Sequence, residues 1–109
     1  MCIFCKIIAG EIPAKIVYED DNFIVIPDIQ PEAPVHFLLI PKQHIDNIMS
    51  ITPELSAAIF GKMGELAQKF DIAKNGFRLV INTGKDGGQT VEHLHVHILA
   101  GRELTWPAG

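Results

Sequence analysis

The chain has 109 residues, and its 48% apolar and 20% charged residues give the balance of a globular domain rather than that of a disordered or fibrous protein. The net charge of −4 argues against broad nucleic-acid binding, since neutralising phosphates requires clustered lysine and arginine side chains. Apolar runs such as Phe23–Ile26 and Phe37–Ile40 are far shorter than the roughly 20 residues of a membrane-spanning helix. With no secretory signal pattern at the N-terminus, we expect one cytoplasmic domain over residues 1–109 that binds neither nucleic acid nor membrane.

The first half of the chain predicts a short helix followed by three strands. A hairpin is indicated by two β-branched or aromatic runs that flank the polar turn Asp20–Asn22. Pro27, Pro31 and Pro34 predict an extended loop before the third strand, and Pro41 ends that strand. The expected elements are a helix of one or two turns at Ile3–Ile8 and strands at Ile16–Glu19, Phe23–Ile26 and His36–Ile40.

A long helix is predicted to follow. Thr52, Pro53 and Glu54 form its start, with a hydroxyl N-cap, a proline at the first helical position and an acid in the first turn. Gly61 and Gly64 each cost such a helix about 1 kcal/mol relative to alanine but leave its period intact. The apolar stripe of this helix has three- and four-residue spacing and consists of Leu55, Ile59, Met63, Leu66 and Phe70.

Two strands and a glycine-rich loop complete the chain. Asn75–Gly76 ends the helical segment, and Phe77–Asn82 and His93–Leu99 are predicted strands on either side of the loop Gly84–Gly88. Strands grouped around one long helix, with a hairpin at the start, indicate an α+β domain built on an antiparallel sheet.

Three histidines alternate along the last predicted strand. Because alternate side chains of a strand share a face, His93, His95 and His97 should point to one side while Leu94 and Val96 point to the other. A single histidine on a strand is usually a structural residue with its own hydrogen-bond partners, whereas three in strict alternation indicate a site. Two kinds of site fit: a metal bound by three histidines, or phosphoryl chemistry with one histidine as the nucleophile.

The loop before these histidines favours phosphoryl chemistry. Gly87 and Gly88 supply backbone N–H groups, Gln89 an amide and Thr90 a hydroxyl, which together can hold an anionic phosphate. The alternative is that these glycines simply make a turn. An imidazole with an ordinary pKa of about 6.5 is largely neutral near pH 7 and is a competent nucleophile, so two-step covalent catalysis is expected.

The pattern of histidine and apolar residues at His93–Leu99 resembles the signature of the histidine-triad superfamily of nucleotide hydrolases and transferases. The resemblance covers nearly the whole chain and points to the branch that hydrolyses nucleoside phosphoramidates. It implies the histidine-triad (HIT) fold, with a five-stranded antiparallel sheet, one long helix and a short N-terminal helix. The matching segments are Phe4–Ile8, Glu11–Lys15, Asp28–Ile29, Ala33–Phe37, Ile40–Lys42, Asp86–Gln89 and Trp106–Pro107.

This resemblance implies roles for individual residues. His95 would be the nucleophile that takes up the nucleoside monophosphate, while His97 and Thr90 would contact the phosphate and help the leaving amine depart. Asp28 would accept hydrogen bonds from the ribose hydroxyls, and His36 would steady the nucleophile. Relatives usually carry serine in place of Thr90, so an altered leaving-group preference is expected. The remaining implied roles are a purine wall at Ile26 and Ile29, phosphoryl contacts at Asn82, Gly88 and Gln89, and a third triad histidine at His93.

A second candidate site combines Cys2 and Cys5, spaced Cys-x-x-Cys, with His44 and His93. Thiolate and imidazole are ligands that zinc prefers, and four of them make the closed site of a structural ion. Bacterial triad proteins and the galactose-phosphate uridylyltransferases resemble this pattern. The alternative is that Cys5 is a small core residue of an enzyme that works without metal. We expect structural Zn²⁺, which would anchor His93 and so orient the adjacent nucleophile, with no cofactor required for the chemistry.

The sequence therefore predicts an enzyme that cleaves the P–N bond of purine nucleoside 5′-phosphoramidates and releases AMP or GMP. Three alternatives stay open: a dinucleoside polyphosphate hydrolase, a nucleotide-binding or scaffold protein with residual activity, and a zinc-dependent hydrolase that uses all three triad histidines as ligands. The resemblance also implies a homodimer in which the C-terminal segment with Trp106 lies near the partner's pocket. Covering an apolar patch is the alternative role for Trp106.

Overall fold

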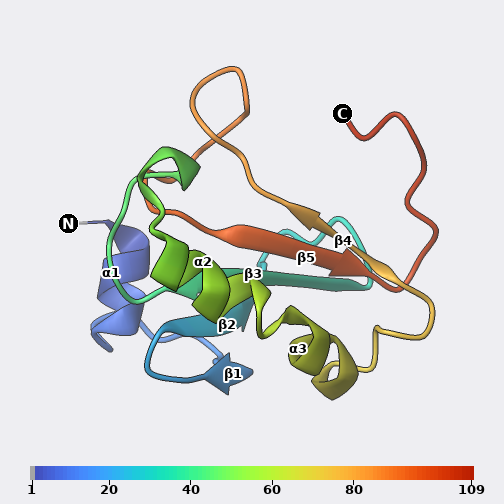
Figure 1. Ribbon diagram of the computed structural model, residues 1–109, viewed down its shortest axis with the longest axis horizontal. Helices are drawn as coiled ribbons and strands as arrows, with labels where there is room; N and C mark the ends of the chain where they lie inside the picture. The colour runs from blue at the N-terminus through green and yellow to red at the C-terminus, as the bar shows by residue number, and fades with distance from the viewer. Residues whose placement is uncertain (1) are drawn as a thin grey trace.

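The protein folds as one antiparallel sheet with helices packed on its faces (Figure 1). The computed structural model describes residues 2–109. The elements, in chain order, are α1 (Ile3–Ile8), β1 (Tyr18–Glu19), β2 (Phe23–Pro27), β3 (Val35–Pro41), the 3₁₀ helix η1 (Ile48–Ser50), α2 (Pro53–Phe60), α3 (Met63–Lys69), β4 (Phe77–Val80) and β5 (Val96–Ala100). The spatial order of the strands is β1-β2-β3-β5-β4. The predicted α+β class, with five antiparallel strands, a long helical segment and a short N-terminal helix, is confirmed.

The two faces of the sheet bury different apolar residues. Alternation along β2 places Phe23 and Val25 on one face and Ile24 and Ile26 on the other. The first face packs against α2 and α3, which lie across the sheet in Figure 1. The second face packs against Phe4 of α1. Burying each large apolar side chain in these two layers stabilises the fold by roughly 1.5–3 kcal/mol.

The second face also carries the histidines of the sheet. His97 on β5 pairs with Leu38 on β3, and His36 precedes Leu38 by two residues, so these three side chains share one face. Leu38 belongs to the apolar cluster around α1. Phe4 of α1 also packs against the rings of His93 and His95, which precede β5.

The helical segment 53–69, of 17 residues, consists of α2 and α3 separated by a turn at Gly61. Thr52 caps α2 as expected, with its Oγ1 accepting a hydrogen bond from the Leu55 amide at 3.1 Å. The turn requires glycine, because a Cβ at Gly61 would collide with the carbonyl oxygen of Ala57. In the part of the chain that the structure describes, the helices lack the combined length and apolar character that crossing a membrane would take.

The last strand begins later than the sequence pattern predicts. β5 starts at Val96 instead of His93, because the backbone before it bonds elsewhere. The Leu94 amide donates to the carbonyl of Ile45, and the His93 amide donates to the carbonyl of Val91, both at 2.8 Å. The segment just before β5 is therefore attached to the loop after β3 and does not continue the ladder.

The other strands differ from the prediction at their ends. β1 begins at Tyr18 instead of Ile16, because its ladder with β2 contains two residue pairs. β4 ends at Val80 instead of Asn82. Val80 pairs with His97, and β5 begins at Val96, so the partner strand ends there in the antiparallel direction. β2 and β3 run slightly further than predicted, through Pro27 and Pro41 respectively.

Candidate active site and metal-ligand cluster

His95 lies immediately before β5, and only 7% of its surface is exposed. Its Nδ1 is 2.7 Å from the carbonyl oxygen of His93. A carbonyl oxygen only accepts hydrogen bonds, so Nδ1 carries the proton and donates, and Nε2 keeps its lone pair. A nucleophilic imidazole requires a nitrogen in this state.

The lone pair on Nε2 of His95 is accessible from solvent. Within residues 2–109, every fully buried side-chain nitrogen or oxygen has a hydrogen-bond partner. The hydrogen bond of this ring is made by Nδ1, so Nε2 reaches the surface although the ring as a whole is buried. Phe4 packs edge-to-face against the ring, with centroids 5.1 Å apart. The ring is thus held in place while one nitrogen stays available.

His36 and His97 form a hydrogen-bonded pair beside His95. The Glu32 amide donates to Nδ1 of His36 at 3.0 Å, so the proton of that ring is on Nε2. Nε2 of His36 in turn donates to Nδ1 of His97 at 2.9 Å, which leaves the proton of His97 on Nε2. Asp28 faces the same His36 proton, with Oδ2 3.4 Å from Nε2. The ring centroids of His95 and His97 are 5.2 Å apart. The two rings are therefore opposite tautomers, with a bare Nε2 on His95 and a protonated Nε2 on His97.

The pKa of His97 is lowered from its ordinary value. Burial is the largest cause, because it disfavours the charged ring, and the nearby His95 and His36 rings lower the pKa further against a smaller opposing effect of Asp28. His97 is therefore a neutral imidazole near pH 7, and its one ring proton is the one on Nε2.

The lowered pKa of His97 predicts a loss of folding stability in weak acid. In the unfolded chain this ring takes up a proton as the pH falls through about 6.5, whereas the folded protein resists protonation. Its contribution to stability is therefore complete above that pH and is lost as the pH falls through the lower folded pKa. His97→Asn removes the titrating ring but keeps an oxygen that can accept from His36. In urea unfolding at neutral pH and at about pH 5.5, wild type should lose more stability than His97→Asn, and equal losses would contradict the assignment.

The glycine-rich loop uses its polar groups for internal hydrogen bonds. Gly88 and Gln89 donate their backbone N–H groups to carbonyls within the loop, at 3.1 and 3.0 Å. The Gln89 side chain accepts from the Gly84 amide at 3.0 Å and donates to the Asp46 carbonyl at 2.6 Å. In this arrangement the N–H groups of Gly88 and Gln89 and the Gln89 side chain therefore have hydrogen-bond partners within the protein. Thr90 follows the turn with an exposed side chain.

The residues expected to contact the nucleoside lie at and after the end of β2. Ile26 is buried, Asp28 is half-buried beside His36, and Ile29 is 95% exposed. Such exposure of a large apolar side chain leaves it available to a ligand or partner. A cavity of about 260 Å³ opens at the histidine pair, and its lining includes His36, Asn82, His97, Arg78 and Arg102.

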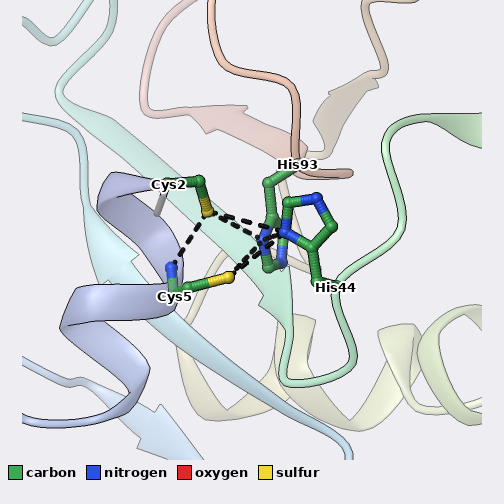
Figure 2. A group of neighbouring side chains, drawn as sticks. All are labelled: Cys2, Cys5, His44 and His93. Carbon is green, nitrogen blue, oxygen red and sulfur yellow. Dashed lines mark hydrogen bonds between the residues drawn. The ribbon is translucent and has the colours of Figure 1, made fainter.

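Four ligand-type side chains meet at the N-terminus of α1 (Figure 2). Cys2 is the N-cap of α1 and Cys5 lies in its first turn, while His44 comes from the loop after β3 and His93 from the segment before β5. Each sulfur is 3.2 to 3.6 Å from the Nδ1 atoms of both histidines, and these two nitrogens are 3.1 Å apart. The structure therefore brings together all four residues that the sequence proposes as ligands.

The hydrogen bonds of the two histidines fit a cation between these atoms. Nε2 of His93 is 2.8 Å from the Pro41 carbonyl, and Nε2 of His44 is 3.1 Å from Oδ1 of Asp46. Both partners are acceptors, so both protons are on Nε2 and the two Nδ1 atoms that face each other are bare. A tetrahedral zinc ion with bonds of about 2.0 Å to nitrogen and 2.3 Å to sulfur would hold its ligand atoms roughly 3.3–3.8 Å apart, close to the observed spacing. The donor set and its outer contacts therefore suit Zn²⁺.

The ionisation of these ligands is coupled. Burial raises the pKa of the Cys2 thiol, but hydrogen bonds with Cys5 and His44 outweigh it and leave that pKa lowered. The hydrogen bond with Cys2 raises the pKa of Cys5, and the hydrogen bond with Asp46 raises that of His44. Cys2 is therefore the thiol that ionises first of the two.

His93 belongs to this cluster, so the expectation that three triad rings line one pocket is wrong. Its ring is completely buried, with Nδ1 facing the sulfurs. The strand alternation does not reach it, because β5 begins only at Val96. Within residues 2–109, the two groups with metal-ligand geometry are Cys2-Cys5-His44-His93 and Asp28-His36-His97. Neither contains His95, so the zinc-dependent hydrolase that binds its ion with all three triad histidines finds no matching group.

The contacts that orient these rings are the part of the site that sequence reasoning missed. Two of them, the Glu32 amide and the Pro41 carbonyl, are backbone groups and carry no sequence signal. Asp46 could have been found from its position two residues after His44, where a carboxylate can orient a metal ligand. Phe4 lies between the two cysteines in sequence, and its apolar ring packs against both His93 and His95.

Comparison with known proteins places this site in a known family. The sequence profile described as "HIT domain" matches residues 9–104. An uncharacterised HIT-like protein of Synechococcus elongatus is 51% identical over 111 aligned positions, which cover 98% of this chain and 96% of that protein. Protein HitA of Neisseria gonorrhoeae is 50% identical over 101 positions, covering 90% and 94%. The crystal structure of a HIT family hydrolase from Legionella pneumophila superposes with a TM-score of 0.95 at 47% identity and covers all of both chains.

The fold and the site together are a five-stranded antiparallel sheet and two neighbouring imidazoles of opposite tautomer. The chain belongs to the HIT domain family and thus to the histidine triad superfamily. This membership supports hydrolase activity as the general function.

Proposed function

We propose that the protein hydrolyses purine nucleoside 5′-phosphoramidates through a nucleotidyl-histidine intermediate on His95. The observation that carries this proposal is the pair of tautomers, with a bare Nε2 on His95 and a protonated Nε2 on His97. The first atom suits attack on phosphorus, and the second suits protonation of a departing amine.

The reaction balances in two steps. In the first, the lone pair on Nε2 of His95 forms a bond to phosphorus, the P–N bond breaks with its electron pair going to the amine, and the amine takes the proton from Nε2 of His97. The negative charge left on the His97 ring is balanced by the positive charge of the substituted His95 ring, whose centroid is 5.2 Å away. In the second, water attacks phosphorus, the bond to His95 breaks with its electron pair returning to Nε2, and His97 accepts a proton from the water. The amine and the nucleoside monophosphate are released, and both rings regain their starting tautomers.

We assign the nucleotide contacts from the positions of the remaining residues. The Asp28 carboxylate, beside His36, suits the ribose hydroxyls, and the exposed Ile29 suits one wall of a purine together with Ile26. The Thr90 hydroxyl is exposed next to the turn and suits a phosphate oxygen. The other proposed phosphoryl contacts are Asn82, Gly88, Gln89, His95 and His97.

Rapid quench of the reaction with adenosine 5′-phosphoramidate, followed by mass spectrometry of the protein, tests this proposal. We expect a transient mass increase of one AMP on the peptide that contains His95. A dinucleoside polyphosphate hydrolase would leave the phosphoramidate intact and form the adduct with the polyphosphate. A nucleotide-binding scaffold would bind AMP and form no adduct with either compound. Each of these two results would overturn the proposal.

We also propose that Cys2, Cys5, His44 and His93 bind a structural Zn²⁺. The bare Nδ1 atoms and the spacing of the four ligand atoms support this assignment. The ion's part is to join α1, the loop after β3 and the segment before β5, and it supplies no chemistry to the reaction. Both cysteines are free thiols, which suits a reducing compartment such as the cytoplasm.

We further propose a homodimer in which β4 meets β4 of a second copy. β4 is at the edge of the sheet and pairs with β5 on one side, so its other side can accept a strand. Phe77 on this strand is 37% exposed, and Arg78 holds the C-terminal segment in which Trp106 is 83% exposed. Sedimentation equilibrium should give twice the chain mass for wild type and a shift toward the chain mass for Phe77→Glu. A monomeric wild type would contradict the proposal.

A further inference from the structure

Arg102 lies outside the reacting groups, yet it holds the loop between β2 and β3. Its Nε and Nη2 both donate to the carbonyl oxygen of Glu32, at 3.2 and 3.0 Å, and its Nη1 donates to the carbonyl of Glu103 at 3.1 Å. No ion pair within residues 2–109 includes Arg102. A planar guanidinium that makes two hydrogen bonds to one oxygen fixes both the position and the orientation of that peptide group.

The Glu32 amide and the Asp28 carboxylate both favour the His36 tautomer with its proton on Nε2, and Glu32 is the one of the two that Arg102 holds. Its carbonyl is held by Arg102, while its amide donates to Nδ1 of His36 at 3.0 Å. The Glu32 side chain makes no part of this connection and is exposed. Glu32 thus connects two parts of the molecule: Arg102 holds its carbonyl oxygen, and its amide donates to His36.

The His36–His97 pair has two proton arrangements, and only one suits the proposed reaction. With the Glu32 amide in place, His36 carries its proton on Nε2, donates to Nδ1 of His97, and leaves the His97 proton on Nε2. Without that amide, only Asp28 still favours a proton on Nε2 of His36, and a fraction of the rings can carry the proton on Nδ1 and accept from His97 at Nε2, which leaves Nε2 of His97 bare. In this second arrangement His97 has no proton to give to a leaving amine.

We propose that Arg102 is a positioning residue that keeps the proton of His97 on Nε2 by holding Glu32 against His36. The effect on turnover rests on the proposed function, whereas the effect on the tautomers does not. Arg102 touches no reacting atom in this account, and its influence passes through two backbone groups of one residue and one imidazole.

Nitrogen-15 NMR of the histidine rings in the full-length protein tests the proposal directly, because bare and protonated ring nitrogens have well separated shifts. In wild type, Nδ1 of His36 and Nδ1 of His97 should be bare, and both Nε2 atoms protonated. Arg102→Gln should convert a measurable fraction of both rings to the opposite tautomer, and Arg102→Lys, with one donor group, should give an intermediate result. Wild-type tautomers in Arg102→Gln would overturn the proposal.

Two control variants separate this role from simple anchoring of the C-terminal segment. Arg78 also donates to backbone carbonyls of that segment, those of Leu104 and Thr105, but not to Glu32, so Arg78→Gln should keep the wild-type tautomers. Glu32→Ala keeps both backbone contacts and should do the same. If Arg78→Gln changes the tautomers as much as Arg102→Gln, the effect comes from the segment as a whole and the proposal is wrong.

Turnover provides a second readout through the leaving group. An alkyl phosphoramidate of AMP needs a proton from His97, whereas the p-nitrophenyl ester of AMP expels an anion that needs none. Arg102→Gln should lower kcat for the phosphoramidate by about tenfold and leave kcat for the ester and KM for both within about twofold. Equal losses of kcat for the two substrates would overturn the role in proton placement. A wild type that cleaves neither substrate would refute the proposed function, and the NMR result would still decide the tautomers.

Discussion

His95→Ala should abolish hydrolysis of nucleoside phosphoramidates while AMP still binds. The substitution removes the nitrogen that attacks phosphorus, so kcat should fall by about 10⁴-fold or more, the scale expected when a covalent nucleophile is lost. Release of amine measures kcat, and titration calorimetry with AMP measures binding. The contacts proposed for ribose and purine lie at Asp28 and Ile29, so the dissociation constant should change by less than about tenfold.

Two further variants separate loss of the nucleophile from loss of packing. His95→Gln keeps a side chain of similar size against Phe4 and should be as inactive as His95→Ala. His95→Gly leaves a space the size of the ring, so added imidazole should restore part of the turnover in a concentration-dependent way. Turnover by His95→Gln at the wild-type rate would refute His95 as the nucleophile.

Cys5→Ser should lose its zinc and a large part of its thermal stability together. Three separate segments of the chain meet at the ligand cluster, so an ion there opposes unfolding of all three. Loss of one thiolate ligand should cost roughly 2–4 kcal/mol, which for a domain of this size corresponds to a fall in Tm of about 10–20 °C. Zinc content by elemental analysis and Tm by calorimetry measure the two effects.

Removal of zinc from the wild type provides the matched control. A strong chelator should lower the Tm of the wild type to about that of Cys5→Ser and should leave the variant unchanged. A chelator that lowers both by the same amount would show that the ion binds elsewhere. Zinc content of Cys5→Ser equal to that of wild type after exhaustive dialysis would remove the proposal of a Cys2-Cys5-His44-His93 site.

The sequence predicts the parts of this fold that depend on side-chain type. Thr52 caps its helix as expected, because a hydroxyl side chain followed by proline and an acid is typical of a helix N-terminus. The alternation on β2 places Phe23 and Ile24 on opposite faces of the sheet. Cys2, Cys5, His44 and His93 come together because their thiols and imidazoles contact one another. In each case the side chain itself determines the contact.

The parts that the sequence does not predict depend on backbone groups. The start of β5 at Val96 follows from the hydrogen bond of the Leu94 amide to Ile45, and any residue except proline offers such an amide. The tautomers of His36 and His95 follow from an amide and a carbonyl that have no side-chain signature. The break at Gly61 could be suspected from glycine, but its position depends on the carbonyl of Ala57.

His93 takes part in both centres through different atoms. Its imidazole faces the two sulfurs, and its carbonyl oxygen accepts the proton of the next ring along the chain. Every residue at position 93 has a main-chain carbonyl oxygen. His93→Cys would therefore keep the acceptor for His95 and would also supply a thiol ligand to the cluster. A cobalt ion at the proposed zinc site would then act as a coloured, paramagnetic reporter bound two residues before the nucleophile, and its spectrum should change when a nucleotide is attached to the His95 ring.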